Sequence, residues 1–492
     1  MTLLWYDLET FGRNPSYDRI AQFAAVRTNG EFEIIEEPVV YYGSLSPDYL
    51  PDPMACLITG ITPQEVNQKG LREVDLLKKI NQHLNRPGTC TTGFNSVSFD
   101  DEFIRNLYYR NFYDPYEREW KNGNSRWDII NLARAAKDLR PEGINWPVTE
   151  DGRATVKLEL LTEANGLSHE KAHDALSDVY ATIAVAKLIR EKQPRLFEWS
   201  FHHRQKKDII PLIDLQNKEP LVFTSPLVQG ENTNTTLVSP LVTDPNRQNV
   251  IYAFDLRFNP ELLLTLSPEE IRKRIFTSSA ELKAEGFERI PLLPIATNKI
   301  PFIAPKSVMG KDTAERLVIN LNEIEKHRRM LQNSPDIVLK LREVYKNTDR
   351  SFTAPDFPDD PDFRIYSGFF PDEDRPILEL IRNTEPENLN SLNIRPRDTR
   401  ILEMLRRYIG RNYPETMNKE QQQSWKAFCA NRLLFPPVPD ATDIGEYRKR
   451  LRNWRVSKKL EADKLPVIKA LEDYGDYLEK TILSSGREFD FS

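Results

Sequence analysis

The first 193 residues alternate short apolar runs with segments that carry apolar residues at helical spacing, and this alternation constrains the fold more than any other feature. The strands we expect span 2–8, 21–26 and 32–41, and the expected helices span 71–84 and 100–109. Strands covered by helices bury both kinds of apolar face. The alternation therefore predicts an α/β domain, which ends with a helical run just before Pro194.

The pattern of the chain changes twice after this domain. At about 150 residues per domain, a chain of 492 residues should form about three domains. Residues 194–347 contain strand-like stretches separated by turn residues, and residues 362–492 contain amphipathic helices. Between them, residues 348–361 are rich in Pro and Asp and have no sustained period. We expect an α/β domain at 1–193, a β-rich domain at 194–347, a linker at 348–361 and a helical domain at 362–492.

Composition and charge narrow the functional classes. The net charge of -6 excludes a uniformly basic protein that covers nucleic acid, and the acidic excess lies in the first 193 residues. No apolar run approaches the roughly 18 residues that span a membrane, and the first residues lack the features of a signal peptide. The three cysteines are widely spaced and odd in number, which fits reduced thiols rather than disulfides or a cysteine zinc site. We expect a cytoplasmic protein without membrane contact.

Two carboxylates, Asp7 and Glu9, follow the apolar residues Leu3 to Trp5 in the first expected strand. Side chains at positions i and i+2 of a strand point to the same face, about 6 to 7 Å apart. One divalent ion could bind between them, although two solvated acids at a strand edge would give the same pattern. Acidic side chains in a buried strand would need such a reason, but the pair taken alone leaves both interpretations open.

Acidic residues recur at two further places in the expected α/β domain. Asp100, Asp101 and Glu102 begin a helix, where the helix dipole alone favours acids, and the spacing leaves open which of the three binds an ion. His173 and Asp178 lie around the start of the last helix. A single histidine is more often structural than catalytic. Together, the order Asp-x-Glu, Asp, His-x4-Asp within one domain is a much more specific signal than any part.

This order of residues resembles the proofreading-type 3′→5′ exonuclease superfamily with a histidine in its third motif. The segments ITGITPQE, NSRWD, LRPEGINWP, LTEANG, AHDALSDVYATIA, QPRLF and, later, YSGFF are similar to the bacterial exodeoxyribonuclease I family. The resemblance covers nearly the full length. It implies an α/β exonuclease domain with a ribonuclease-H-like mixed sheet, a β-rich SH3-like domain and an α-helical C-terminal domain. It also implies processive 3′→5′ degradation of single-stranded DNA to 5′-mononucleotides, in DNA repair and recombination.

The resemblance assigns roles to the five motif residues. Asp7, Glu9, Asp100 and Asp178 match the four acidic positions of the family, which hold two divalent metal ions, and His173 matches the general base. Mg²⁺ is the expected ion, with Mn²⁺ as a substitute. Carboxylate oxygens are the ligands that such hard cations prefer, and a metal pair can stabilise both oxygens of a phosphoryl displacement. A histidine, whose ordinary pKa is about 6.5, can accept a proton at neutral pH.

The resemblance also implies contacts with substrate and partner. Thr10 is similar to the family position that contacts the terminal nucleotide, and its neighbours Glu9 and Phe11 are further candidates for this contact. Phe11 directly follows the Asp-x-Glu-Thr motif and is the aromatic we favour for base stacking. Arg140 and Trp199 match a surface that binds the acidic, hydrophobic C-terminal tail of single-stranded DNA-binding protein. We expect a monomer.

Three alternatives stay open at this point. The five motif residues do not distinguish ribose from deoxyribose, so a 3′→5′ exoribonuclease would carry them too. A non-catalytic scaffold that binds single strands could retain the fold. The basic run at 447–455 is either a DNA track or the solvated face of a helix whose buried stripe contains Leu451 and Trp454.

Overall fold

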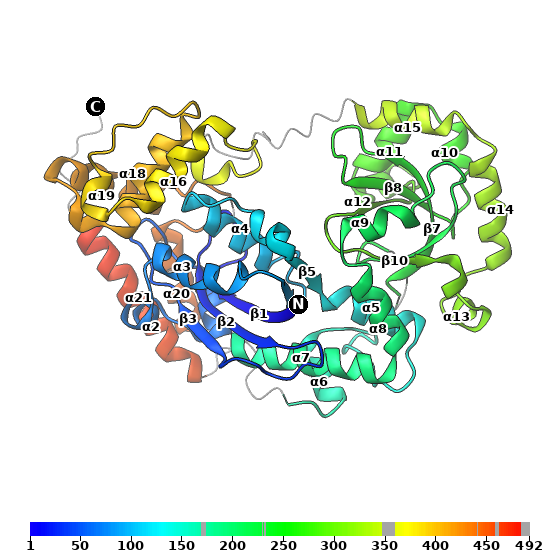
Figure 1. Ribbon diagram of the computed structural model, residues 1–492, viewed down its shortest axis with the longest axis horizontal. Coiled ribbons are helices and arrows are strands. Elements are labelled where there is room, and N and C mark those ends of the chain that lie inside the picture. The colour runs from blue at the N-terminus through cyan, green and yellow to red at the C-terminus, as the bar shows by residue number, and fades with distance from the viewer. Residues whose placement is uncertain are drawn as a thin grey trace.

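The structure is a computed structural model with three domains (Figure 1). It describes residues 1–168, 174–228, 230, 233–346, 360–439, 441–457 and 462–483. Most of the expected linker at 348–361 lies outside the described residues. In Figure 1 the middle domain (green) and the C-terminal helices (yellow to red) lie at opposite ends of the view, each against the N-terminal domain (blue to cyan).

The N-terminal domain is built on a mixed five-stranded sheet with the strand order β3-β2-β1-β4-β5. Its strands are β1 Thr2–Thr10, β2 Ile20–Thr28, β3 Val39–Tyr42, β4 Thr89–Gly93 and β5 Ser125–Asp128. Its helices are α1 Pro53–Thr59, α2 Pro63–Lys69, α3 Glu73–Leu84, α4 Asp100–Arg110, α5 Ile129–Leu139, α6 Leu158–Ala164 and α7 Ala175–Lys192, and α8 Pro194–His202 follows at the boundary with the middle domain. The central strand β1 pairs antiparallel with β2 and parallel with β4. The α/β domain predicted from the sequence is confirmed.

Strand β1 shows why helices cover both faces of this sheet. Leu3 and Trp5 pack with residues of α5 and α7 in one apolar cluster, whereas Leu4 and Tyr6 pack with α3 and α4 in another. Successive side chains of a strand point to opposite faces. Asp7 therefore lies on the face of α7, in step with Leu3 and Trp5.

The third expected strand, 32–41, is only partly correct. The strand β3 begins at Val39, and the preceding residues turn instead. Phe32 has a φ of 64°, and its N–H donates to the Asn29 carbonyl at 3.2 Å. Pro38, which has no N–H to donate to a neighbouring strand, directly precedes β3. Local turn chemistry thus overrides the apolar pattern.

The middle domain contains a five-stranded antiparallel sheet with the order β10-β6-β7-β8-β9. Its strands are β6 Leu221–Thr224, β7 Thr235–Thr243, β8 Val250–Asp255, β9 Leu292–Ala296 and β10 Phe302–Pro305. Its helices are α9 Lys206–Ile209, α10 Glu261–Thr265, α11 Pro268–Phe276, α12 Ser279–Ala284, α13 Lys311–Arg316, α14 Leu321–Gln332 and α15 Ile337–Lys346. The β-rich character predicted for this region is confirmed.

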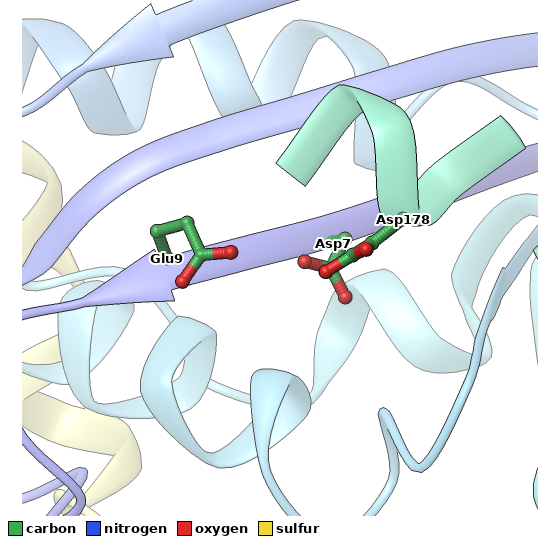
Figure 2. A group of neighbouring side chains, drawn as sticks. All are labelled: Asp7, Glu9 and Asp178. Atoms are coloured by element: carbon green, nitrogen blue, oxygen red, sulfur yellow. The ribbon is translucent and has the colours of Figure 1, made fainter. Parts of the chain in front are cut away.

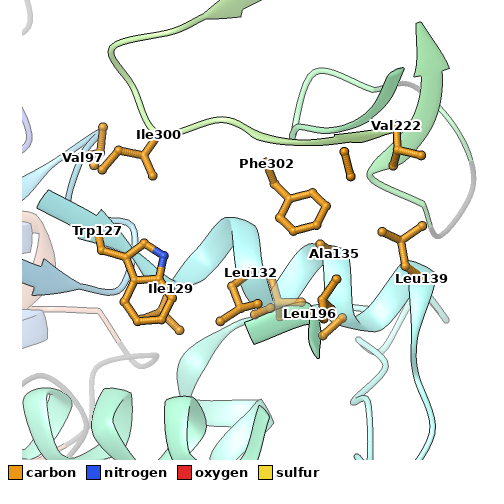
Figure 3. Close-up of a cluster of buried hydrophobic side chains, with 14 of the residues drawn as sticks. Val97, Trp127, Ile129, Leu132, Ala135, Leu139, Leu196, Val222, Ile300 and Phe302 are labelled. Carbon is orange, nitrogen blue, oxygen red and sulfur yellow. The ribbon is translucent and has the colours of Figure 1, made fainter. Parts of the chain in front are cut away.

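The middle domain shares its core with the N-terminal domain. Leu132, Ala135 and Leu139 of α5 belong to the same apolar cluster as Val222 of β6 and Phe302 of β10 (Figure 3). Helix α8, which begins at Pro194, lies against α5 and α7. The predicted boundary at this proline therefore falls between two packed helices and not at a flexible connection.

The C-terminal domain consists of helices and short helical turns over its described residues. The helices are α16 Arg375–Asn383, α17 Pro386–Leu389, α18 Arg400–Asn412, α19 Lys419–Leu434, α20 Ile444–Arg455 and α21 Leu465–Leu478. Their apolar cluster extends into the N-terminal domain and includes residues such as Phe11, Tyr49 and Val66. The predicted helical domain is confirmed.

A group of buried ion pairs joins the C-terminal domain to the N-terminal domain. We call it the arginine–aspartate cluster, and its members are Asp48, Asp360, Asp362, Arg407, Arg411 and Arg432. Arg411 of α18 contacts Asp48 of the N-terminal domain at 2.8 Å and Asp362 at 2.5 Å. Such pairs require both domains to be present and correctly placed.

Among the described residues, no helix combines the length and apolar character needed to cross a bilayer. The three cysteines, Cys56, Cys90 and Cys429, are buried free thiols.

Candidate active site

Three carboxylates from two elements meet at the N-terminal end of α7. Asp7 and Glu9 extend from β1, and Asp178 extends from the first turns of α7. Each offers one oxygen such that these oxygens all lie within 4.8 Å of one another. Figure 2 shows Asp178 and Asp7 pointing toward one another, with Glu9 further along the same strand. We call Asp7, Glu9 and Asp178, together with the adjacent Asp100, the acidic cluster.

The sequence around Asp174 explains why α7 begins where it does. Asp174 is the N-cap, and its carboxylate accepts a hydrogen bond from the Ser177 N–H at 3.2 Å. Val179 and Ile183 are buried and hold the helix on the sheet. The charge of Asp174 also acts on Asp7. Sequence analysis did not single out Asp174, although an aspartate directly before an apolar helical run is a usual helix-start signal.

Asp100 lies beside the other acidic residues, at the start of α4. Its carboxylate accepts a hydrogen bond from the Leu8 N–H at 3.0 Å, and Leu8 stands between Asp7 and Glu9 on β1. Asp100 is 4% exposed. The structure thus brings together all four acidic residues that the sequence predicted for one site.

The two neighbours of Asp100 are engaged elsewhere. Asp101 accepts hydrogen bonds from Tyr6, Arg118 and Arg126, each at 2.6 Å. Glu102 pairs with Arg105 at 2.8 Å. These contacts neutralise both acids, which leaves Asp100 as the residue of this turn that belongs to the acidic cluster.

The pKa values of Asp7, Glu9 and Asp100 all lie above their ordinary values. Desolvation by burial is the largest cause for each of these three residues, and nearby carboxylates add to it. The pKa of Asp7 lies well above its ordinary value because the charges of Asp100 and Asp178 add to this burial. Burial and the charge of Asp178 raise the pKa of Glu9 to about 8. Carboxylates held together in this way favour either protonation or a cation.

The donor set fits a divalent metal ion. The three converging groups are carboxylates, and hard cations such as Mg²⁺ prefer oxygen ligands. The strongest charges acting on Asp7 and Glu9 are negative, so a cation would relieve their repulsion. Residues Asp7, Glu9 and Asp178 could hold one ion directly, and Asp100 lies where it could assist with a second.

Thr10 and Phe11 follow Glu9 at the end of β1, where the pairing with β2 shifts register. The Thr10 hydroxyl donates to the Gly12 carbonyl at 2.7 Å, and a Cβ at Gly12 would lie 2.1 Å from the Asp18 carboxylate. Phe11 is 1% exposed as a whole residue, and its ring lies inside the core shared with the C-terminal domain. Its N–H donates to the Arg19 carbonyl at 2.9 Å, and its carbonyl accepts from the Asp52 N–H at 2.8 Å. A ring buried in this way is not available for base stacking, which corrects the expectation of stacking.

Arg140 and Trp199 line one pocket between the N-terminal and middle domains. The pocket has a volume of about 420 Å³. Its lining residues are Arg140, Gln193, Pro194, Arg195, Leu196, Trp199, Phe302, Ala304 and Val308. The Arg140 guanidinium donates to the Val308 carbonyl at 3.1 Å, and the Trp199 indole donates to the Ile303 carbonyl at 2.9 Å. Cations and apolar side chains thus share one concave surface.

Two further expectations have different outcomes. His173 lies outside the described residues, so its position relative to the acidic cluster stays a prediction. The basic run forms α20, in which Tyr447 and Leu451 are buried. Its Arg448 pairs with Asp476 at 2.7 Å and with Glu479 at 2.5 Å. These pairs favour the solvated helix face over the DNA track.

Models of known protein families match all three domains of the chain. An exonuclease family model matches residues 4–186, the exonuclease I SH3-like domain matches 204–347, and the exonuclease I C-terminal domain matches 359–478. Exodeoxyribonuclease I of Haemophilus influenzae is 40% identical over 470 residues, which are 96% of this chain and 97% of that protein.

Solved structures of exonuclease I have the same fold as this chain. Exonuclease I from Methylocaldum szegediense has a TM-score of 0.92 at 40% identity, covering 97% of this chain and 99% of that chain. Escherichia coli exonuclease I in complex with a dA16 oligonucleotide has a TM-score of 0.91 at 40% identity, with the same coverage. These comparisons confirm the resemblance seen in the sequence, and the chain belongs to the exodeoxyribonuclease I family of 3′→5′ exonucleases.

Proposed function

We propose that this protein degrades single-stranded DNA processively from its 3′ end to 5′-mononucleotides, by hydrolysis that depends on two divalent metal ions. The observation that carries the proposal is the convergence of Asp7, Glu9 and Asp178 within 4.8 Å, with Asp100 fixed beside them. Four carboxylates from β1, α4 and α7 on one site match the chemistry of a metal-assisted phosphodiester hydrolase.

Related structures support the substrate. Escherichia coli exonuclease I has been solved with dA16 and, in a zinc-bound form, with single-stranded DNA. A further exonuclease I structure, 39% identical to this chain, has been interpreted as suggesting how processivity is achieved. Each of these matches covers 97% of this chain and 99% of the related chain, so we expect the same substrate.

The residues of the acidic cluster have separable roles. Asp7 and Glu9 on β1 and Asp178 on α7 would hold the first ion, and Asp100 would assist with the second, which we take to be Mg²⁺ or, as a substitute, Mn²⁺. Bound divalent ions would polarise the scissile phosphate and stabilise charge on its oxygens. His173 would accept the proton of the attacking water, because an imidazole titrates near neutral pH.

The residues at the end of β1 would position the terminal nucleotide. Glu9 and Thr10 lie at the register shift of β1, next to the acidic cluster. The Thr10 hydroxyl donates to the Gly12 carbonyl in the turn that follows the strand. We assign to Glu9 and Thr10 a contact with the 3′ nucleotide, and to Phe11 the support of this strand end from the core.

The pocket of Arg140 and Trp199 is our candidate for the tail of single-stranded DNA-binding protein. A terminal carboxylate next to an apolar side chain suits a guanidinium beside an indole. An exonuclease I that is 38% identical to this chain has been solved in a structure of single-stranded DNA-binding protein and exonuclease I with the inhibitor CFAM. This structure supports the same partner for the family.

We propose domain limits of 1–193, 194–347 and 362–492, with a linker at 348–361 whose residues Asp360 and Pro361 pack on the C-terminal domain. A monomer that acts in the cytoplasm, in DNA repair and recombination, is the setting we expect.

The test is digestion of 5′-labelled single-stranded DNA, matched RNA and matched duplex in parallel with Mg²⁺. Unlabelled competitor added after the start measures processivity. We expect rapid loss of the single-stranded DNA alone, resistant to competitor. The same digestion is carried out with Asp178→Asn, which removes a carboxylate of the acidic cluster. Asp473→Asn, which changes an exposed acid of α21, is its matched control. Preferential loss of RNA would instead indicate an exoribonuclease, and binding without hydrolysis a scaffold.

A further inference from the structure

The side chain of Gln22 lies on the same face of the sheet as the acidic cluster. Gln22 of β2 stands opposite Glu9 of β1 and opposite Tyr42 of β3. Residues directly opposite one another on neighbouring strands share a face. Gln22 is 3% exposed, so its amide is buried beside Glu9. A buried amide is costly unless its polar atoms find partners.

Both polar atoms of the Gln22 amide have hydrogen-bond partners. One of these partners is the backbone at the N-terminus of α7. The Ala175 N–H donates to Gln22 Oε1 at 3.2 Å, and Gln22 Nε2 donates to the Tyr42 hydroxyl at 3.1 Å. Ala175 is the first residue of α7, where backbone N–H groups have no partner inside the helix. The amide therefore links three strands to the first turn of α7.

The link acts on the part of α7 that carries Asp178. The Asp178 N–H donates to the Asp174 carbonyl at 3.0 Å, which closes the same first turn that Ala175 begins. Apolar residues such as Val179 and Ile183 hold the rest of the helix on the sheet. They fix the distance between helix and sheet, but a sliding or fraying first turn would move Asp178 along β1.

We propose that Gln22 is a positioning residue of the metal site. Its amide holds the first turn of α7 against β2 and thereby sets the Asp178 carboxylate opposite Asp7 and Glu9. This inference rests on the proposed metal-dependent function. An apolar side chain of similar length would fill the same space as Gln22. It would, however, leave the Ala175 N–H without an acceptor, and this is the role that we assign to the glutamine.

The experiment compares metal binding in three variants of the full-length protein. Mn²⁺ affinity is measured by electron paramagnetic resonance without DNA, and the Mg²⁺ dependence of cleavage is measured in parallel. Gln22→Met keeps the length of the side chain and removes both hydrogen bonds. We expect Mn²⁺ affinity and turnover to fall about 10- to 100-fold, as for other residues that orient metal ligands.

The two other variants separate positioning from general stability. Thr28→Val removes the buried hydrogen bond from Trp5 Nε1 to Thr28 Oγ1, 2.9 Å long, from the same strand β2. It should lower the melting temperature as Gln22→Met does but leave Mn²⁺ affinity unchanged. Tyr42→Phe keeps Gln22 as the acceptor of the Ala175 N–H but removes the hydrogen bond from Gln22 Nε2 to the Tyr42 hydroxyl. We therefore expect Mn²⁺ affinity to fall about two- to tenfold.

Each outcome decides the inference. Wild-type Mn²⁺ affinity in Gln22→Met overturns it, and so does an equal loss in Thr28→Val. Should Gln22→Met fail to fold, wild-type affinity in Tyr42→Phe overturns it in the same way. A wild-type protein that neither binds Mn²⁺ nor cleaves DNA would overturn the proposed function and this inference with it.

Discussion

The acidic cluster and the arginine–aspartate cluster both gather buried carboxylates, yet their electrostatics are opposite. In the arginine–aspartate cluster, Asp362 is 2% exposed and contacts Arg411, Arg407 and Arg432 at 2.5, 2.9 and 2.8 Å. These guanidinium groups hold the pKa of Asp362 well below its ordinary value. In the acidic cluster, the neighbouring charges are carboxylates, and they raise the pKa of Asp7.

The difference indicates what each cluster is for. Arginines that neutralise buried acids join two domains and need nothing from outside. Acids whose strongest neighbours are other acids are destabilising until a cation arrives, which is how a binding site differs from a structural ion pair. The contrast is sharpest within one turn of α4, where the pKa of Asp100 is raised and that of Asp101, held by Arg126 and Arg118, is lowered.

The largest effect should come from Asp178→Asn. Removing one ligand oxygen charge should lower turnover of single-stranded DNA by more than about a hundredfold, since even residues that only orient ligands cost 10- to 100-fold. The free energy of unfolding without metal should not fall, because repulsion with Asp7 and Glu9 is relieved. Single-turnover cleavage and urea unfolding measure the two quantities. Wild-type turnover, or a strongly destabilised variant, would remove the contrast between the clusters.

Asp362→Asn should have the opposite profile. Breaking a buried ion pair by removing one partner typically costs about 3 to 5 kcal/mol, because the arginines remain buried without their counter-charge. We expect a loss of unfolding free energy of this order, with Mn²⁺ affinity unchanged in the protein that remains folded. Chemical denaturation and metal titration at 15 °C would show it. A variant as stable as the wild type would mean that the cluster contributes only specificity.

The pH dependence of stability should have opposite signs at the two clusters. The folded pKa of Asp362 is lowered, so its contribution is present above the unfolded pKa of about 3.9 and is lost as pH falls through the folded value. The folded pKa of Glu9 is raised to about 8, so in metal-free protein its contribution is lost as pH rises from about 4.3 to that value.

The comparison of wild type with Glu9→Gln isolates the second effect. Without metal, the difference in unfolding free energy between them should turn against the wild type as pH increases from 5 to 8. Added Mg²⁺ should abolish this trend in the wild type. A difference that stays constant over this range would show that Glu9 is ionised in the folded protein without any cation.

The smallest effect should come from the exposed ion pairs of α20. Arg448→Gln removes contacts with Asp476 and Glu479, and we expect a loss of less than about 1 kcal/mol because such pairs are solvated. The affinity for single-stranded DNA and its salt dependence should not change. A weaker affinity with a flatter salt dependence would revive the DNA track on this helix.

The segments that carry the acidic cluster could be placed from local patterns. Asp7 and Glu9 stand at alternate positions of an apolar strand, and Asp178 follows a helix start. The assignment of these residues to one metal site came from the resemblance to the exonuclease family. The choice of Asp100 over Asp101 could not be derived from the pattern of the chain. It depends on Arg118 and Arg126, which only the fold brings to Asp101.

The arginine–aspartate cluster and the burial of Phe11 could not be predicted. Arg411 and Asp48 are 363 positions apart, and no local pattern marks them as partners. Phe11 follows the acidic pair of Asp7 and Glu9, which suggested contact with a base, but the C-terminal domain contributes residues to the core that encloses its ring. Both features arise where two domains meet, and strand or helix periodicity carries no information about such contacts.

The most direct test of the account is the anomalous diffraction of crystals soaked in Mn²⁺. We predict anomalous peaks among the carboxylates of Asp7, Glu9, Asp178 and Asp100, and none at Asp362, whose oxygens contact arginines. Absence of a peak at the acidic cluster, or a peak at the arginine–aspartate cluster, would contradict the claim that missing counter-charge distinguishes the metal site from the structural one.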